Sequence, residues 1–116
     1  MTTKQREDWL AQVRRGLLEL CILTLIGQES TYGYEIVTQL SRTPQLAAGE
    51  GTVYPLLRRL RRDGLLSTRW KESDAGPPRQ YYELTVAGKQ HLGALRGDWT
   101  AIVDAVRISL EGENVT

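Results

Sequence analysis

Residues 51–64 read GTVYPLLRRLRRDG, and this stretch decides the fold of the chain. On a helix at about 100° per residue, its side chains separate into an apolar stripe and a basic face. The stripe contains Val53, Leu56, Leu57 and Leu60. The opposite half contains Tyr54, Arg58, Arg61 and Arg62, with Arg59 at its edge. The pattern therefore predicts an amphipathic helix that buries one face and exposes a row of arginines.

Two residues limit where this helix begins and ends. Pro55 has no backbone N–H, so it belongs in the first turn of a helix or at a mild kink. The helix therefore begins either at Gly49, with a kink at Pro55, or after Thr52 acting as the N-cap. At the other end, Gly64 can adopt the left-handed conformation that commonly follows a helix. Both alternatives for the start place Tyr54 in or beside the first turn.

The flanking sequence predicts two helices before this one and a hairpin after it. Residues 9–27 are proline-free and apolar almost all round towards their end, which is typical of a helix buried by several neighbours. Residues 31–42 predict a shorter helix, and the apolar patch at Leu46 could pair briefly as a strand. Two aromatic and β-branched runs surround the turn DAGPP, which predicts a β-hairpin. We interpret Trp70, on its first strand, as a packing residue next to the core.

The last predicted element is a helix of about 25 residues, capped by Thr85 and running from Val86 to Leu110. Its apolar residues recur at steps of three or four residues, at Leu92, Leu95, Trp99, Ile102, Val106 and Leu110. Such a seam is typical of helix pairing, and a helix this long exceeds what one small domain can bury. We therefore expect these six residues to form a dimer interface.

The order of elements predicts a mainly α (α+β) fold. Three helices followed by a hairpin form a winged helix-turn-helix domain, over residues 1–84. Residues 85–116 then form a long C-terminal dimerisation helix that packs with the first helix as one compact unit. The length of 116 residues fits this single unit.

The net charge of +1 conceals an uneven distribution, because residues 52–81 hold seven bases and three acids. A local basic stripe of this kind indicates an electrostatic footprint. The N-terminus does not have the pattern of a signal peptide, and no apolar run is long enough to cross a membrane. Cys21, the only cysteine, is interpreted as a small buried hydrophobe, so we expect a cytoplasmic protein.

The arginine row predicts binding to double-stranded DNA. A charged helix face is often merely solvated, but this one is of a single sign until Asp63. Guanidinium groups suit phosphates and guanine edges, and winged-helix proteins insert the helix before the hairpin into the major groove. Arg79 follows the stiff Pro77-Pro78 pair at the hairpin tip, where it can reach the minor groove or phosphates.

Nothing in the sequence predicts enzymatic chemistry. His91, the only histidine, has no nucleophile and acid that the sequence places beside it, and we expect it to be exposed. Metal-ligand spacings, phosphate-binding glycine loops and hydrolase motifs are missing from the sequence. We therefore expect no catalytic residues, no metal and no cofactor.

The chain resembles the PadR family of bacterial transcriptional regulators, in the short form that has a single C-terminal helix. The resemblance lies in RRGLLELCILTLI, YGYEI, GTVYPLLRRLRRDGLL and RQYYELTVAG, in this order over residues 14–88. It implies a winged-helix homodimer that represses transcription, and we expect it to bind an inverted-repeat operator. The expected DNA-binding residues lie on the second helix, the recognition helix and the wing. They are Tyr34, Thr52, Tyr54, Arg58, Arg61, Arg62 and Arg79.

The same resemblance implies a place for a small effector. Some members of the family bind flat aromatic compounds between tryptophans at the dimer centre, and Trp99 occupies a matching position. We therefore expect a small aromatic or hydrophobic effector to bind at Trp9, Val13, Trp99 and Val103. Two alternatives stay open: a winged-helix module that binds proteins rather than DNA, and a sensor whose main role is capture of a hydrophobic compound.

Overall fold

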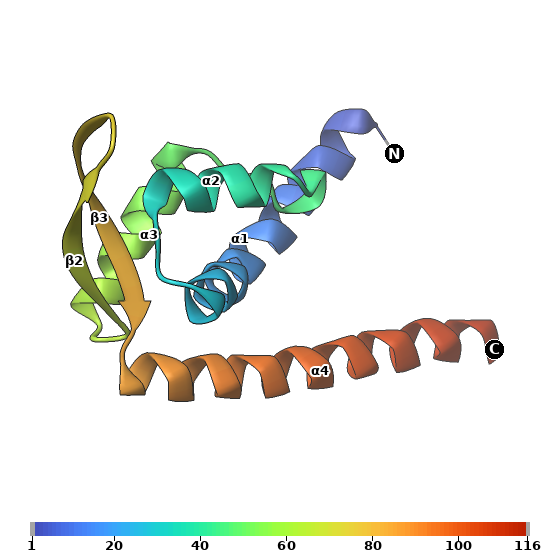
Figure 1. Cartoon of the computed structure of the whole chain (residues 1–116). Coiled ribbons are helices and arrows are strands. Elements are labelled where there is room, and N and C mark those ends of the chain that lie inside the picture. Colours follow the sequence, from blue (N-terminus) through green and yellow to red (C-terminus); the bar gives the residue numbers. More distant parts are fainter. Residues whose placement is uncertain (1, 116) are drawn as a thin grey trace.

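The computed structural model describes residues 2–115, and side chains up to residue 112. Figure 1 shows three helices gathered on one side of a hairpin, with a long helix running beneath them. In chain order the elements are α1 (Thr3–Gln28), β1 (Thr31–Tyr32), α2 (Gly33–Ser41), the 3₁₀ helix η1 (Pro44–Leu46), α3 (Glu50–Arg62), β2 (Leu66–Ser73), β3 (Gly76–Leu84) and α4 (Val86–Val115). The predicted mainly α, winged helix-turn-helix fold is confirmed.

The core lies between α1, α2, α3, the base of the hairpin and the start of α4. Its buried side chains are Leu18, Ile22, Leu23, Ile26, Ile36, Leu40, Val53, Leu57, Leu60, Leu66, Tyr82 and Leu92. Three of the four stripe residues of α3 are among them, while Leu56 is half-buried. The apolar face predicted for α3 is therefore the face that holds this helix to the domain.

The start of α3 follows the first of the two predicted alternatives, the one in which the helix begins near Gly49. The helix begins at Glu50 with Gly49 as its N-cap and continues through Pro55. An N-cap role for Thr52 is therefore wrong, since its own N–H donates to the Gly49 carbonyl at 3.1 Å. At the other end, Gly64 has φ +79°. Its N–H and that of Leu65 donate to carbonyls in the last turn, which closes the helix as a Schellman motif.

A three-stranded antiparallel sheet, in the order β1-β3-β2, forms the wing. The two residues of β1 pair with Tyr81 and Tyr82 of β3. This short strand was missed, because its residues were predicted to begin the second helix. The strand predicted near Leu46 is also wrong, since Pro44–Leu46 form η1. The register shifts near the hairpin tip, between Lys71 and Ser73, opposite the pair of prolines.

The long helix α4 starts as predicted and continues further. The Thr85 hydroxyl accepts a hydrogen bond from the Gly88 N–H at 3.0 Å, so Thr85 caps the helix. From Arg96 to Gly112 every described side chain of α4 is exposed, and Figure 1 shows this half extending past α1. Within residues 2–115, no helix is both long and apolar enough to cross a membrane.

Candidate nucleic-acid interface

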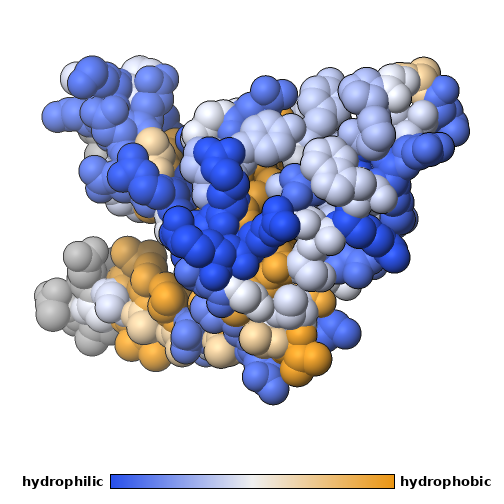
Figure 2. Space-filling model, turned by 90° about the vertical axis from the view of Figure 1, so that its left-hand side faces the viewer, coloured by the Kyte–Doolittle hydropathy of each residue, from blue (hydrophilic) through white to orange (hydrophobic). Residues whose placement is uncertain are grey.

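An open hollow lies where the start of α2, the outer face of α3 and the wing meet. It is lined by Tyr32, Gly33, Tyr34, Tyr54, Arg58, Trp70, Arg79, Gln80 and Tyr82. Among these described lining residues two are cationic, five are aromatic and none is acidic. Figure 2 views the wing side of the molecule and shows strongly hydrophilic side chains gathered above the orange surface of α4. The hollow therefore favours an anionic, partly flat ligand.

A glycine allows α2 and α3 to meet at this hollow. Gly33 is the first residue of α2, and a Cβ placed there would lie 2.2 Å from Cε1 of Tyr54. The Tyr54 ring therefore occupies space that any other residue at position 33 would fill. Burial, and then the charge of Glu50, raise the pKa of the Tyr54 hydroxyl, which keeps it a neutral hydrogen-bond donor.

Three arginines of α3 face solvent, as predicted. The side chains of Arg58, Arg61 and Arg62 are exposed, and Arg58 also lines the hollow. Arg62 lies 4.0 Å from the Asp63 carboxylate, at the limit of an ion pair. Among the described residues, Arg58 and Arg61 have no carboxylate partner within that distance. Their charge is therefore free to meet an external anion.

The wing adds cations that are held against aromatic rings. The Arg79 guanidinium lies over the Tyr32 ring, 4.5 Å from its centroid. Lys71 lies over the Tyr81 ring at 4.4 Å, and the two rings contact each other with centroids 5.2 Å apart. Such stacking orients a charged group without neutralising it. Arg79 thus keeps its charge at the rim of the hollow.

The predicted DNA-binding residues fall into two groups in the structure. Four of them, Tyr34, Tyr54, Arg58 and Arg79, line the same hollow. Thr52, Arg61 and Arg62 are exposed on α3 but lie outside that lining.

Trp70 was misassigned, because it does not pack against the core. It pairs with Gln80, one step along the same sheet face beyond the Thr68–Tyr82 pair, and it is 68% exposed. Side chains in a strand point to alternate faces of the sheet, so Leu66, Thr68 and Trp70 share the face that packs on the core at Leu66. This alternation does not show how far along the strand the core extends. Tyr32 and Gln80, which also line the hollow, were not predicted either. The polar residue Gln80, which pairs with Trp70, indicates that this part of the sheet face lies outside the core.

His91 and Arg59 form a separate polar cluster on the other side of α3. The Glu19 carboxylate of α1 accepts a short hydrogen bond from Arg59 and lies 2.7 Å from Nε2 of His91. His91 is half-buried beside Glu19, so the expectation that it is exposed is wrong. Burial would raise the pKa of Glu19, but hydrogen bonds from His91 and Arg59 outweigh it and lower this pKa. Arg59, which also contacts Asp63 at 3.4 Å, is thereby occupied within the protein.

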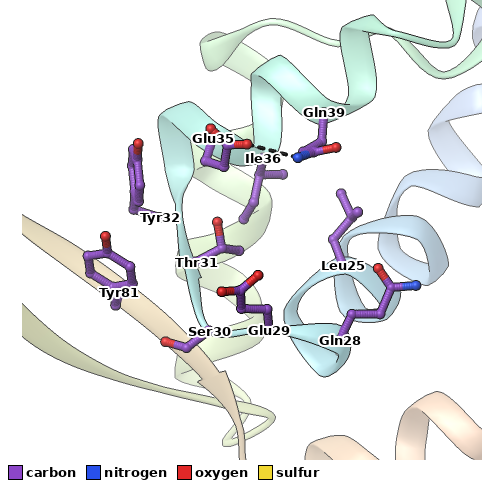
Figure 3. A pocket seen from close by; sticks show the side chains of 10 residues that line it. All are labelled: Leu25, Gln28, Glu29, Ser30, Thr31, Tyr32, Glu35, Ile36, Gln39 and Tyr81. Atoms are coloured by element: carbon purple, nitrogen blue, oxygen red, sulfur yellow. Dashed lines mark hydrogen bonds between the residues drawn. The ribbon is translucent and has the colours of Figure 1, made fainter.

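A second hollow, beside the start of α2, has the opposite character. Figure 3 shows it between α1, α2 and the wing, lined by Leu25, Gln28, Glu29, Ser30, Thr31, Tyr32, Glu35, Ile36, Gln39 and Tyr81. Glu35 accepts a hydrogen bond from Gln39 at 2.8 Å, and Glu29 lies across the opening. The two carboxylates would repel the phosphate groups of a nucleic-acid backbone. Charge therefore separates this hollow from the basic one, although the two share Tyr32.

The residues expected at a dimer interface are mostly available on α4. Trp99, Ile102, Val106 and Leu110 are exposed, and Leu95 is half-buried. Leu92 is 5% exposed because it packs into the core of its own chain, so it offers little area to a partner.

The expected effector residues do not share a hollow within one chain. Trp9, Val13, Trp99 and Val103 are all exposed. Trp99 lines two hollows, one with Leu56 and Leu95 and the other with Cys21 and Leu46, and neither includes the other three residues. Within one chain the structure therefore does not bring these four side chains together in a single hollow.

A winged helix-turn-helix with a basic third helix and a long C-terminal helix defines a class of regulatory proteins. Residues 22–94 match the model of the transcriptional regulator PadR-like family, and the chain belongs to that family. It is similar to the transcriptional regulator Rv3488 of Mycobacterium tuberculosis, with 32% identity over 107 residues that cover 92% of this chain and 95% of that protein.

Two solved structures show the same likeness in three dimensions. A PadR family transcriptional regulator from Eggerthella lenta superimposes with a TM-score of 0.84 at 31% identity, over 93% of this chain and 94% of the other. The Bacillus subtilis PadR, whose structure contains operator DNA, gives a TM-score of 0.61 at 28% identity. That match covers 72% of this chain and 46% of the B. subtilis chain.

Proposed function

We propose that this PadR-like transcriptional regulator binds double-stranded DNA as a homodimer and represses transcription from an inverted-repeat operator. The observation that carries the proposal is the basic aromatic hollow next to the exposed arginines of α3. The hollow borders α3, and winged-helix proteins insert the corresponding helix into the major groove, which supports the proposal. The operator complex of the Bacillus subtilis relative supports the same use of the fold.

The contacts can be divided by position. Tyr54, Arg58 and Arg61 lie on the outer half of α3, where they reach base edges and the flanking phosphates. Arg79, held over Tyr32, reaches phosphates or the adjacent minor groove from the wing. Tyr34 is 61% exposed at the start of α2 and, from there, contacts the sugar-phosphate backbone.

The exposed half of α4 supplies the dimer contact. Trp99, Ile102, Val106 and Leu110 recur at helical spacing on one side of a helix that its own chain leaves uncovered. Exposed apolar surface of this extent is a mark of an interaction site. A twofold dimer through α4 would present two copies of α3 to successive major grooves, about 34–36 Å apart.

A small effector would act on this dimer at its centre. Trp9, Val13, Trp99 and Val103 offer flat and branched apolar side chains from α1 and α4. A site shared between protomers would link occupancy of the effector to the separation of the two α3 helices. Quenching of tryptophan fluorescence by aromatic compounds, lost in Trp99→Ala, tests this part separately.

The test of DNA binding is selection of bound sequences from a random pool of duplex DNA, followed by mobility-shift titration. We expect an inverted repeat with half-sites one helical turn apart. Arg58→Ala should weaken binding to the selected sequence and leave the dimer intact. Arg6→Ala removes an exposed positive charge from the far end of α1 and serves as the matched control. Recovery of no enriched sequence, together with the absence of salt-dependent DNA binding, would support the protein-binding alternative.

A further inference from the structure

One carboxylate joins three helices. Glu19 lies on α1 with its side chain 22% exposed, and its two oxygens contact different helices. Oε1 accepts a hydrogen bond from the Arg59 guanidinium of α3. Oε2 lies 2.7 Å from Nε2 of His91 on α4. Glu19 is therefore a polar link between the helix that carries the arginine row and the helix that extends from the domain.

A second link joins the same two helices at their nearest ends. The Thr85 hydroxyl donates to the Gly64 carbonyl at 2.6 Å, and its backbone N–H donates to Leu65 at 3.1 Å. Gly88 packs so closely that a Cβ there would lie 2.0 Å from the Leu65 carbonyl oxygen. These contacts fix the start of α4 to the end of α3, but a single point of attachment does not set an angle.

The two links constrain the direction of α4 together with the apolar packing of Leu92 and Leu95 against the core. Thr85 and His91 are six residues apart, which is about 9 Å along a helix axis. Beyond His91 the helix continues for 24 residues to Val115, or about 36 Å. A tilt of about 5° at the links would thus move the far end by about 3 Å. A small change at Glu19 is amplified by the length of the helix.

We propose that Glu19 is a positioning residue that sets the angle between α3 and α4, and through it the operator spacing that the dimer accepts. The inference rests on the proposed homodimeric binding of DNA. If α4 pairs two protomers, the α3–α4 angle in each protomer decides how far apart the two α3 helices lie. Glu19 then contributes to the selection of half-site spacing without touching DNA.

The alternative role for Glu19 is simple stabilisation, which the structure makes a small effect. The carboxylate and the Arg59 guanidinium are both partly exposed, and exposed ion pairs typically contribute only about 0–1 kcal/mol. Leu92, in the same turn as His91, is buried in the core and supplies apolar packing there. Apolar packing has little directional preference, whereas hydrogen bonds are directional. The cluster formed by Glu19, Arg59 and His91 is therefore better suited to orient α4 than to stabilise its attachment to the domain.

The test uses the full-length dimer and a series of operators with identical half-sites and different central spacers. One extra base pair moves a half-site by about 3.4 Å and about 35°. The measured quantity is spacing selectivity, the affinity for the best spacer divided by that for a spacer one base pair longer. We expect Glu19→Ala to lower this ratio at least threefold. Glu19→Gln, which keeps a hydrogen-bonding group for each partner, should retain the ratio within twofold.

Three further variants separate orientation from loss of structure. Arg59→Met breaks only the α3 arm of the cluster and His91→Leu only the α4 arm, and each should lower the ratio as Glu19→Ala does. Asp8→Ala removes an exposed ion pair to Lys4 within α1 and should leave the ratio unchanged. If Glu19→Ala is unfolded, the two single-arm variants decide the question.

The outcomes are distinct. An unchanged ratio in folded, dimeric Glu19→Ala, or in both single-arm variants, overturns the inference. So does equal loss in Glu19→Gln and Glu19→Ala. A wild-type protein that binds none of the operators contradicts the proposed function instead. A readout without DNA is the distance between spin labels on Thr52→Cys of the two protomers, in a Cys21→Ser background. Its distribution should broaden in Glu19→Ala, and an unaltered distribution would count against the inference.

Discussion

Arg58 and Arg59 are adjacent in the chain, but their guanidinium groups have different surroundings. Arg58 is exposed at the basic hollow, whereas Arg59 contacts Glu19 and Asp63. If the proposed DNA contact is correct, Arg58→Met should reduce the salt dependence of operator binding. Arg59→Met should not, when both are measured at the best operator spacing. The two substitutions remove the same charge from the same helix and therefore control for each other.

The expected size of the effect follows from the release of counterions. In a dimer, Arg58→Met removes one phosphate contact from each protomer, so two contacts are lost. The slope of log Kobs against log salt should become shallower by about 1.8, at about 0.9 per contact. Between about 50 mM and 200 mM salt, a slope difference of this size corresponds to about tenfold in affinity. Fluorescence anisotropy titrations at four or more salt concentrations can resolve such a difference.

Two results would refute the reasoning. If Arg58→Met has the same slope of log Kobs against log salt as the wild-type protein, this guanidinium does not contact phosphate. An equal reduction in Arg58→Met and Arg59→Met would show that the ion pair with Glu19 does not withhold Arg59 from DNA. Sedimentation of each variant is needed beside the titrations, since loss of the dimer would also halve the number of contacts.

Three further predictions concern single residues. Gly33→Ala should displace the Tyr54 ring and weaken operator binding by about 1–3 kcal/mol, measured by mobility shift beside a circular dichroism spectrum that stays unchanged. Gly64→Ala should lower the free energy of unfolding by about 1–2 kcal/mol, because φ there is positive, and urea titration would measure it. Burial raises the pKa of Glu19, but hydrogen bonds from His91 and Arg59 outweigh it and lower this pKa. The contribution of Glu19 to stability should therefore be present above the ordinary value of 4.5 and be lost as pH falls through the lowered pKa. Glu19→Gln should flatten this part of the acid-unfolding curve, and an identical curve would contradict the assignment.

Periodicity predicted the parts of the fold that a repeating pattern encodes. The stripe of Val53, Leu57 and Leu60 marked the buried face of α3, and Thr85 and Gly64 marked helix ends by their own chemistry. The start of α3 was left between two alternatives, since glycine caps a helix without a side-chain signature. The outcome was decided by backbone geometry that the local sequence does not specify.

The misassigned residues depend on contacts between distant parts of the chain. β1 exists only because Tyr32 pairs with Tyr81 of β3, which no local pattern reveals. His91 is partnered because Glu19, 72 positions earlier, lies beside it. Trp70 is exposed because the core ends one pair before it along the hairpin. The candidate site was therefore predictable along α3, where it is local, and incomplete where three elements meet.

The hairpin is an exposed sheet edge, and its composition protects it from growth into larger sheets. β2 is an outer strand, and the charged residues Arg69, Lys71 and Glu72 lie along it. On β3, Pro77 and Pro78 lack the N–H groups that another strand would need, and the register shifts opposite them. Charged edges, prolines and bulges all discourage a second chain from adding a strand. The hairpin edge is therefore a poor place for a strand of another molecule to add.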